Sequence, residues 1–178
     1  LGTRNSLCSF YLYSFLKNKN IIIGISCYYH DSSITVIKEG SILFALQEER
    51  VSRLKNDSSF PKLALRTALD YLNLEISEVE AFVFYEKPLL KFERLMEGYL
   101  ATSPLGFKSF KAAIPDWAGK KLFLKRDINK NLQDFKKINF EKKIYFSEHH
   151  LSHLASSFYP SPFSKSLLLS IDGVGEMQ

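Results

Sequence analysis

The feature that most restricts the fold is a run of β-branched apolar residues that begins at position 21. Residues 21–27 read IIIGISC, and a continuous apolar run of this length is typical of a strand that is buried on both faces. Two more apolar runs follow at 33–37 and 41–46, and Glu39-Gly40 between them suits a hairpin turn because glycine readily takes a positive φ. The pattern predicts three consecutive antiparallel strands.

After this meander the apolar spacing alternates between helical and extended periods. Pro61 falls in the first turn of the next expected helix, where a missing N–H costs least. A meander followed by a crossover unit predicts an α/β fold, with a mixed sheet and flanking helices. The expected elements are a helix at 60–73, a strand at 80–85, amphipathic helices across 88–140, a strand at 143–146, a helix at 148–159 and a strand at 165–171.

The composition is that of an ordinary globular protein: the 178 residues are 46% hydrophobic and 24% charged. The net charge of +5 comes largely from scattered lysine pairs, which favour a solvated face and make nucleic acid an unlikely partner. No segment approaches the roughly 20 apolar residues that span a bilayer, so no membrane segment is expected. Cys8 and Cys27 imply no disulfide framework and fit a reducing cytoplasm.

The two ends of the sequence differ in character from its middle. Residues 1–20 read as a non-native or disordered leader, and the domain is expected to occupy 21–178. The chain begins with Leu1 rather than methionine and ends just after a glycine loop. We therefore expect an incomplete, N-terminal piece of a larger domain.

The strongest chemical signal is a histidine cluster at the start of the expected helix at 148–159. His149 and His153 are four residues apart, so they share one helix face with Cβ atoms roughly 5–6 Å apart, close enough to bind one divalent metal. His150 faces elsewhere and suits a supporting or substrate-facing role. The alternative is a helix that merely happens to contain histidines. Two imidazoles need a further ligand, expected to be a carboxylate from outside the chain or from a distant residue.

Two polar loops at strand ends are candidate ligand sites. Residues 28–32 place His30 and Asp31 where the histidine can accept a proton near neutral pH, although an Asx-type turn in solvent is an equal alternative. Asp172, Gly173 and Gly175 follow the last expected strand, where glycines let backbone amides approach an anion and the aspartate can hold a metal or orient water. Such a glycine pair is also common in ordinary turns.

A charged segment follows the third expected strand. Arg50, Arg53 and Lys55 suit pairing with phosphate or carboxylate oxygens. The alternative is an ordinary solvated surface.

Together, the segments at 24–33, 48–61, 148–163 and 170–176 resemble the carbamoyltransferase family, which includes nodulation-factor and antibiotic-tailoring enzymes. The resemblance implies an actin-like, ribonuclease H-like first lobe. Complete members continue with a second lobe and a separate domain that makes carbamoyl adenylate from carbamoyl phosphate and ATP, and both parts are missing here. We therefore expect the chain to be inactive alone.

The resemblance also assigns roles to individual residues. It implies that His149 and His153 bind iron or a similar divalent metal, with an aspartate from the later half as third ligand. His30 would activate the acceptor hydroxyl of a small molecule or sugar, supported by Asp31. The nucleotide would be held by Lys55 and Arg50 together with the loop of Asp172, Gly173 and Gly175.

Three alternatives remain open at this point. Transfer of a threonylcarbamoyl group to tRNA would want a basic RNA-binding face. A sugar kinase or chaperone-type ATPase of the same fold would need no histidine pair. An inactive truncated module would act only by binding.

Overall fold

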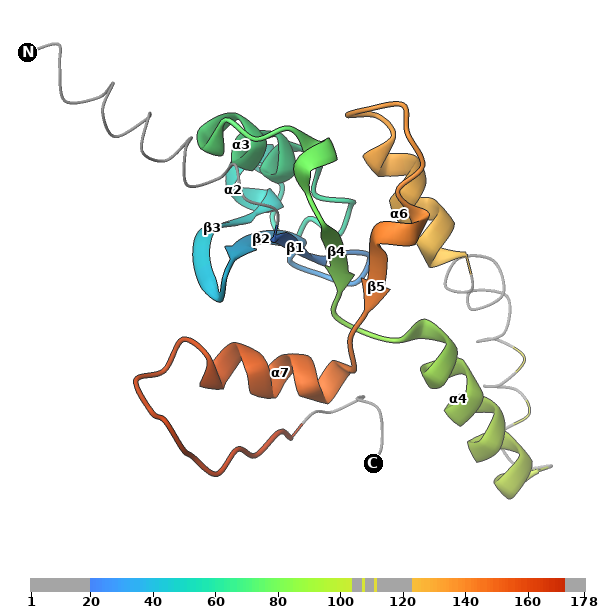
Figure 1. The fold of residues 1–178 in the computed structure, drawn as a ribbon. Coiled ribbons are helices and arrows are strands. Elements are labelled where there is room, and N and C mark those ends of the chain that lie inside the picture. Colours follow the sequence, from blue (N-terminus) through green and yellow to red (C-terminus); the bar gives the residue numbers. More distant parts are fainter. Residues whose placement is uncertain (1–19, 104–106, 108–110, 112–122, 172–178) are drawn as a thin grey trace, which may run out of the picture. The chain divides into compact units, whose positions relative to one another are not determined.

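The structure, a computed structural model, describes residues 20–103, 107, 111 and 123–171 (Figure 1). These residues fall into two compact units. The first contains the described residues from 20 to 84 and from 128 to 145, and the second contains the described residues from 85 to 127 and from 146 to 171. The expected sites at His30 and Lys55 belong to the first unit, and the histidine pair belongs to the second.

A five-stranded mixed sheet forms the centre of the first unit, in the order β3-β2-β1-β4-β5. Strand β1 is antiparallel to β2 and parallel to β4, and β2 is antiparallel to β3. This confirms the expected α/β, actin-like lobe with three antiparallel strands at its start. The strands are β1 (Ile21–Ser26), β2 (Ser33–Lys38), β3 (Ser41–Gln47), β4 (Ala81–Phe84) and β5 (Ile144–Phe146).

The hairpin between β2 and β3 turns at the expected residues. Glu39 and Gly40 have φ values of 50° and 80°, and two successive positive φ angles match the right-handed twist of the flanking strands. The pairing shifts register between Val36 and Ile37, which marks a local irregularity in the ladder.

The sheet buries one face, where strand neighbours contribute matching apolar side chains. Ile23 lies opposite Val36 on one side and Phe82 on the other, and all three are buried. Ile22, which points to the other face, is 38% exposed. The prediction that β1 is buried on both faces was therefore wrong for the described residues. The described elements cover the face that carries Ile23 and leave the face that carries Ile22 partly exposed.

Helix α3 (Lys62–Leu72) contacts β2 and β3 and confirms the expected helix at 60–73. It buries Ala64, Leu65, Ala68, Leu69 and Leu72, which recur at helical spacing, and it ends at Asn73 in the left-handed conformation. The remaining helical elements are α2 (Glu48–Ser52), α4 (Pro88–Thr102), α6 (Leu124–Leu132), α7 (His149–Phe158) and the short 3₁₀ turns Ile76–Glu78 and Glu141–Lys143.

Two expected elements differ from the structure. The helical prediction over 88–140 holds for α4 and α6, but residues 133–138 form turns and bends, and most of 104–122 lies outside the described residues. Residues 165–171 form no strand among the described residues, and Leu167 is 98% exposed. A strand needs a neighbour to satisfy its amides, and no described strand pairs with this segment. None of the helices in the described ranges has the length and apolarity to cross a membrane.

Candidate functional site

Helix α7 presents its two expected metal ligands toward one another. His149 Nε2 and His153 Nε2 are 3.1 Å apart, and the two rings are nearly perpendicular with centroids 4.7 Å apart. Two imidazole nitrogens bound at about 2.1 Å to one tetrahedral or octahedral ion would be separated by roughly 3.0–3.4 Å. The pair therefore fits two neighbouring positions on a single divalent metal. Without a metal, one ring can donate a hydrogen bond to the other at the same distance.

Within the described residues, no group of three or more histidine, cysteine, aspartate or glutamate side chains converges as a metal site. The imidazole pair thus supplies two ligands and leaves positions for others. The prediction that a further ligand must come from elsewhere stays a prediction.

The segment between β4 and α4 lies against the first turn of α7. Ser152 Oγ donates to the carbonyl oxygen of Tyr85 at 3.0 Å, and Lys87 Nζ pairs with Glu148 Oε1 at 2.8 Å. The Tyr85 ring packs beside the His149 ring with centroids 5.6 Å apart. These contacts fix the helix end that carries the histidine pair.

Between those two attachments, Glu86 faces His149. Its Oε2 lies 3.9 Å from His149 Nδ1, and the side chains are only 10% and 14% exposed, respectively. No periodic pattern in the sequence points to this residue, because it is a single carboxylate after a short strand. The polar residue at a strand end was the only available clue.

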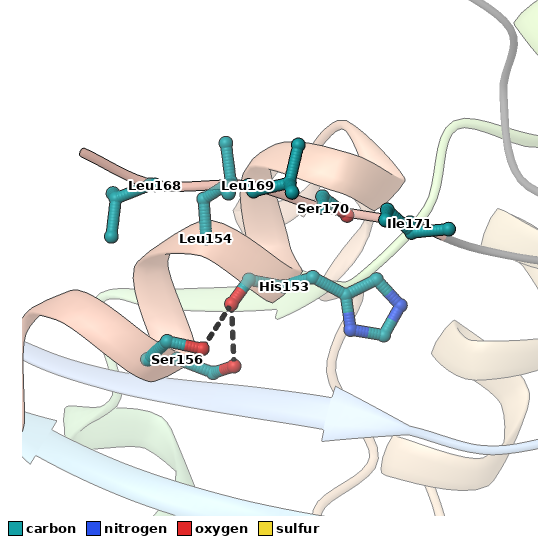
Figure 2. A pocket seen from close by; sticks show the side chains of 8 residues that line it. His153, Leu154, Ser156, Leu168, Leu169, Ser170 and Ile171 are labelled. Atoms are coloured by element: carbon teal, nitrogen blue, oxygen red, sulfur yellow. Dashed lines mark hydrogen bonds between the residues drawn. The ribbon is translucent and has the colours of Figure 1, made fainter.

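A groove of about 250 Å³ runs along α7 beside His153 (Figure 2). Residues 168–171 form its other wall, and Leu154 points toward that segment. Ser156 and Ser157 lie on the same stretch of helix, and both hydroxyls donate to the His153 carbonyl oxygen, at 2.8 and 3.1 Å. The groove combines apolar walls with two serine hydroxyl groups that are bonded to the backbone of His153.

In the first unit, two loops lie side by side at one end of the sheet. The Tyr28 N–H donates to the Ser58 carbonyl oxygen at 2.8 Å, and the Ser32 N–H donates to the Asp57 carbonyl oxygen at 2.9 Å. The backbone therefore brings together the loop that carries His30 and the loop that carries Lys55. Four residues of these loops have positive φ, which is uncommon outside glycine and concentrates at functional sites: Tyr28, Asp31, Arg53 and Asn56.

His30 and Asp31 form a side-chain pair at the tip of the first loop. The distance from His30 Nδ1 to Asp31 Oδ2 is 2.9 Å, and the side chains are 61% and 41% exposed. A carboxylate at Nδ1 favours the tautomer that carries its proton there, which leaves Nε2 free to accept a proton. The arrangement has the parts of a solvent-accessible general base.

The two expected phosphate-binding cations occupy the neighbouring helix and loop. Arg50 lies on α2 with its side chain 69% exposed, and its Nε is 3.7 Å from Glu49 Oε1. Lys55 is exposed in the turn that follows. That turn is tied to α2, because the Asn56 N–H donates to Glu49 Oε2 at 3.1 Å. Asp172, Gly173 and Gly175 lie outside the described residues.

Burial raises the pKa of the Cys27 thiol well above its ordinary value, so this cysteine stays protonated and inert at neutral pH. Cys27 is a free cysteine at the end of β1. It is a core residue and takes no part in the site.

Comparison with known proteins gives one family match over nearly the whole chain. Residues 21–178 match the model described as carbamoyltransferase N-terminus. An uncharacterised protein of Synechocystis is 47% identical over 157 residues, which cover 87% of this chain and 26% of that protein. Nodulation protein NolNO of Sinorhizobium fredii is 28% identical over 147 residues, covering 83% of this chain and 20% of NolNO.

An uncharacterised protein of Methanocaldococcus jannaschii is 28% identical over 156 residues, covering 88% of this chain and 23% of the relative. The chain thus spans between a fifth and about a quarter of the length of these relatives. The family model begins where β1 begins, at residue 21. The chain therefore belongs to the carbamoyltransferase family, and residues 21–178 are an N-terminal carbamoyltransferase domain.

Proposed function

We propose that this domain forms part of a metal-assisted site that transfers a carbamoyl group from carbamoyl adenylate to a hydroxyl of a small molecule or sugar. The single observation that supports it most is the 3.1 Å separation of the Nε2 atoms of His149 and His153. When bound there, a divalent metal such as iron supplies a Lewis acid for the carbonyl oxygen and neutralises the departing phosphate.

The residues of the chain perform the remaining steps. His30 Nε2 accepts the proton of the acceptor hydroxyl while Asp31 holds the proton on Nδ1. The acceptor oxygen forms a bond to the carbamoyl carbon, the bond from that carbon to the phosphate oxygen breaks, and AMP leaves. Lys55 and Arg50 offer exposed cations to the nucleotide phosphate, and the loop of Asp172, Gly173 and Gly175 completes the nucleotide site.

The proposal assigns the other reactants and parts to the longer protein. Carbamoyl phosphate and ATP supply carbamoyl adenylate in an adenylate-forming domain, and a second lobe contributes the third metal ligand, which makes this chain inactive alone. The short share of each relative that the chain covers supports this division. A reducing cytoplasm suits the free thiol of Cys27.

The family match weighs against the two enzyme alternatives of similar fold. A sugar kinase or chaperone-type ATPase needs no pair of imidazoles for its reaction. Transfer to tRNA would need a strongly basic surface, and the net charge of +5 is mild. An inactive module remains the alternative that only measurement separates.

Metal analysis of the whole protein tests the proposal. The wild type should bind one divalent ion per chain, and His149→Ala or His153→Ala should lose it. His150→Ala is the matched control, because it removes an imidazole from the same helix end and should retain the metal. Full metal content in both His149→Ala and His153→Ala would overturn the proposal.

A further inference from the structure

We propose that Glu86 is a positioning residue that accepts the Nδ1 proton of His149 and thereby presents His149 Nε2 as a metal ligand. This inference rests on the proposed metal site. It concerns a residue outside the histidine pair, and one that faces the other nitrogen of the ring.

Glu86 and His153 approach opposite nitrogens of the His149 ring. Glu86 Oε2 is 3.9 Å from His149 Nδ1, whereas His149 Nε2 is the atom that meets His153 at 3.1 Å. The carboxylate therefore lies on the side of the ring away from the candidate metal position. Histidines that bind metals usually donate their second N–H to a carboxylate, carbonyl or water, which fixes the tautomer and the ring orientation.

Glu86 is held beside α7 by its neighbours in sequence. Its two neighbours in sequence are both attached to α7, Tyr85 through the Ser152 hydroxyl and Lys87 through Glu148. A carboxylate between two such attachments has little freedom to move away from the ring. Its side chain is only 10% exposed, and a buried carboxylate is stabilised by a hydrogen-bond donor at close range. His149 Nδ1, at 3.9 Å, is beyond hydrogen-bond distance in the structure, and an Nδ1–H group there becomes such a donor once the two side chains approach by about 1 Å.

The same tautomer of His149 accounts for the contact between the two imidazoles when no metal is bound. If His149 carries its proton on Nδ1, its Nε2 is an acceptor, and His153 can donate an Nε2 proton to it at the observed 3.1 Å. The same tautomer leaves His149 ready for a metal once the His153 proton is released. The opposite tautomer of His149 would block its Nε2 with a proton.

The tautomer of His149 is measured first, by ¹⁵N NMR of the metal-free whole protein at a pH where the ring is neutral. The wild type should show His149 protonated on Nδ1. In Glu86→Met, which keeps the length of the side chain but removes the acceptor, the population should shift toward the Nε2-protonated form. A wild type protonated on Nε2 overturns the proposal without any variant, and so does an unchanged tautomer in folded Glu86→Met.

Titration with Co²⁺ supplies the second readout. Glu86→Met should bind Co²⁺ about 10- to 100-fold more weakly than the wild type. Glu86→Gln should lose less, because its amide oxygen still accepts the proton. Glu97→Gln, which removes an exposed carboxylate from α4 in the same unit, is the control and should bind normally.

The two proposals fail in different ways. If His149→Ala and His153→Ala abolish Co²⁺ binding while folded Glu86→Met binds as well as the wild type, the metal site stands and the role of Glu86 is wrong. If all three variants bind Co²⁺ like the wild type, the metal site itself is wrong and the role of Glu86 falls with it.

Discussion

The carboxylate of Glu48 accepts a hydrogen bond at 2.7 Å from the backbone N–H of Ala64, 16 residues further along the chain. Its other oxygen accepts the Leu63 N–H at 3.0 Å. Helix α3 begins after Pro61, which offers no side-chain cap. Glu48 therefore satisfies amides that the first turn leaves open, and it places a negative charge at the positive end of the helix.

Glu48→Ala should destabilise the protein by about 1–3 kcal/mol, because it removes the acceptor for two amides at a buried helix end. Urea denaturation followed by circular dichroism measures the change. Glu80→Gln, at an exposed position of the same unit, should stay within about 0.5 kcal/mol of the wild type. Equal stability of Glu48→Ala and the wild type would show that water replaces the cap.

Protonation of the Asp57 carboxylate should weaken the loop that carries Lys55, because this carboxylate accepts hydrogen bonds within the loop. Hydrogen bonds from the Ser59 hydroxyl and backbone N–H, at 2.6 and 3.0 Å, lower the pKa of the Asp57 carboxyl below its ordinary value. A lowered pKa in the folded state adds stability above the unfolded-state pKa, near 3.9, and this stability is lost as the pH falls through the folded-state value.

Ser59→Ala should move the pKa of Asp57 back toward its ordinary value, which an NMR pH titration of the carboxyl resonance measures. The stability difference between Ser59→Ala and the wild type should be present at neutral pH and should shrink in acid. A difference that grows on acidification contradicts this assignment. Ser77→Ala serves as the comparison, since that hydroxyl donates to Glu75 instead.

His30→Ala should lower the rate of carbamoyl transfer by about 10²- to 10⁴-fold, as expected for loss of a general base. Single-turnover release of AMP from preformed carbamoyl adenylate, with acceptor present, measures it in the whole protein. Asp31→Asn should fall between His30→Ala and the wild type, because the imidazole remains but its Nδ1 partner weakens. A His30→Ala variant with unchanged transfer would leave the loop without a role in proton transfer.

Phe140 supports the sheet from a turn rather than from a helix. It is fully buried and meets Phe82 edge to face with ring centroids 5.7 Å apart. Phe140→Ala should cost about 3–5 kcal/mol through lost burial and a cavity. Thermal and urea unfolding measure it, with Leu63→Ala on the exposed side of α3 as a control of small effect. A loss under about 1 kcal/mol would mean that the core closes around the gap.

The elements that could be predicted from sequence are those whose signal is local. The apolar runs of β1 to β3 and the Glu39-Gly40 turn define the meander by themselves. The four-residue spacing of His149 and His153 placed both rings on one face of α7, and the structure brings their Nε2 atoms together. Helical geometry is enough to link residues at that spacing.

The features that the sequence did not reveal depend on tertiary contacts. Glu48 lies in a charged run that is typical of a surface, yet the structure buries it. Its hydrogen-bond partners on α3 are 15 and 16 residues away in sequence, so no local pattern links them to it. Glu86 stands out only through its position 3.9 Å from His149, a residue 63 positions away in sequence within the same unit. The apolar pattern at 165–171 predicts a strand, and that prediction was wrong for the described residues, because a strand requires a partner that no described residue provides.

That unpaired stretch has a practical consequence for handling the protein. Leu167, Leu169 and Ile171 are each more than 80% exposed, and an exposed apolar segment of this kind favours association with other copies of the chain. Concentrated solutions of the 178-residue chain should therefore scatter light and polymerise with time. A charged residue at position 167 should delay this, because unmatched charges repel stacked copies.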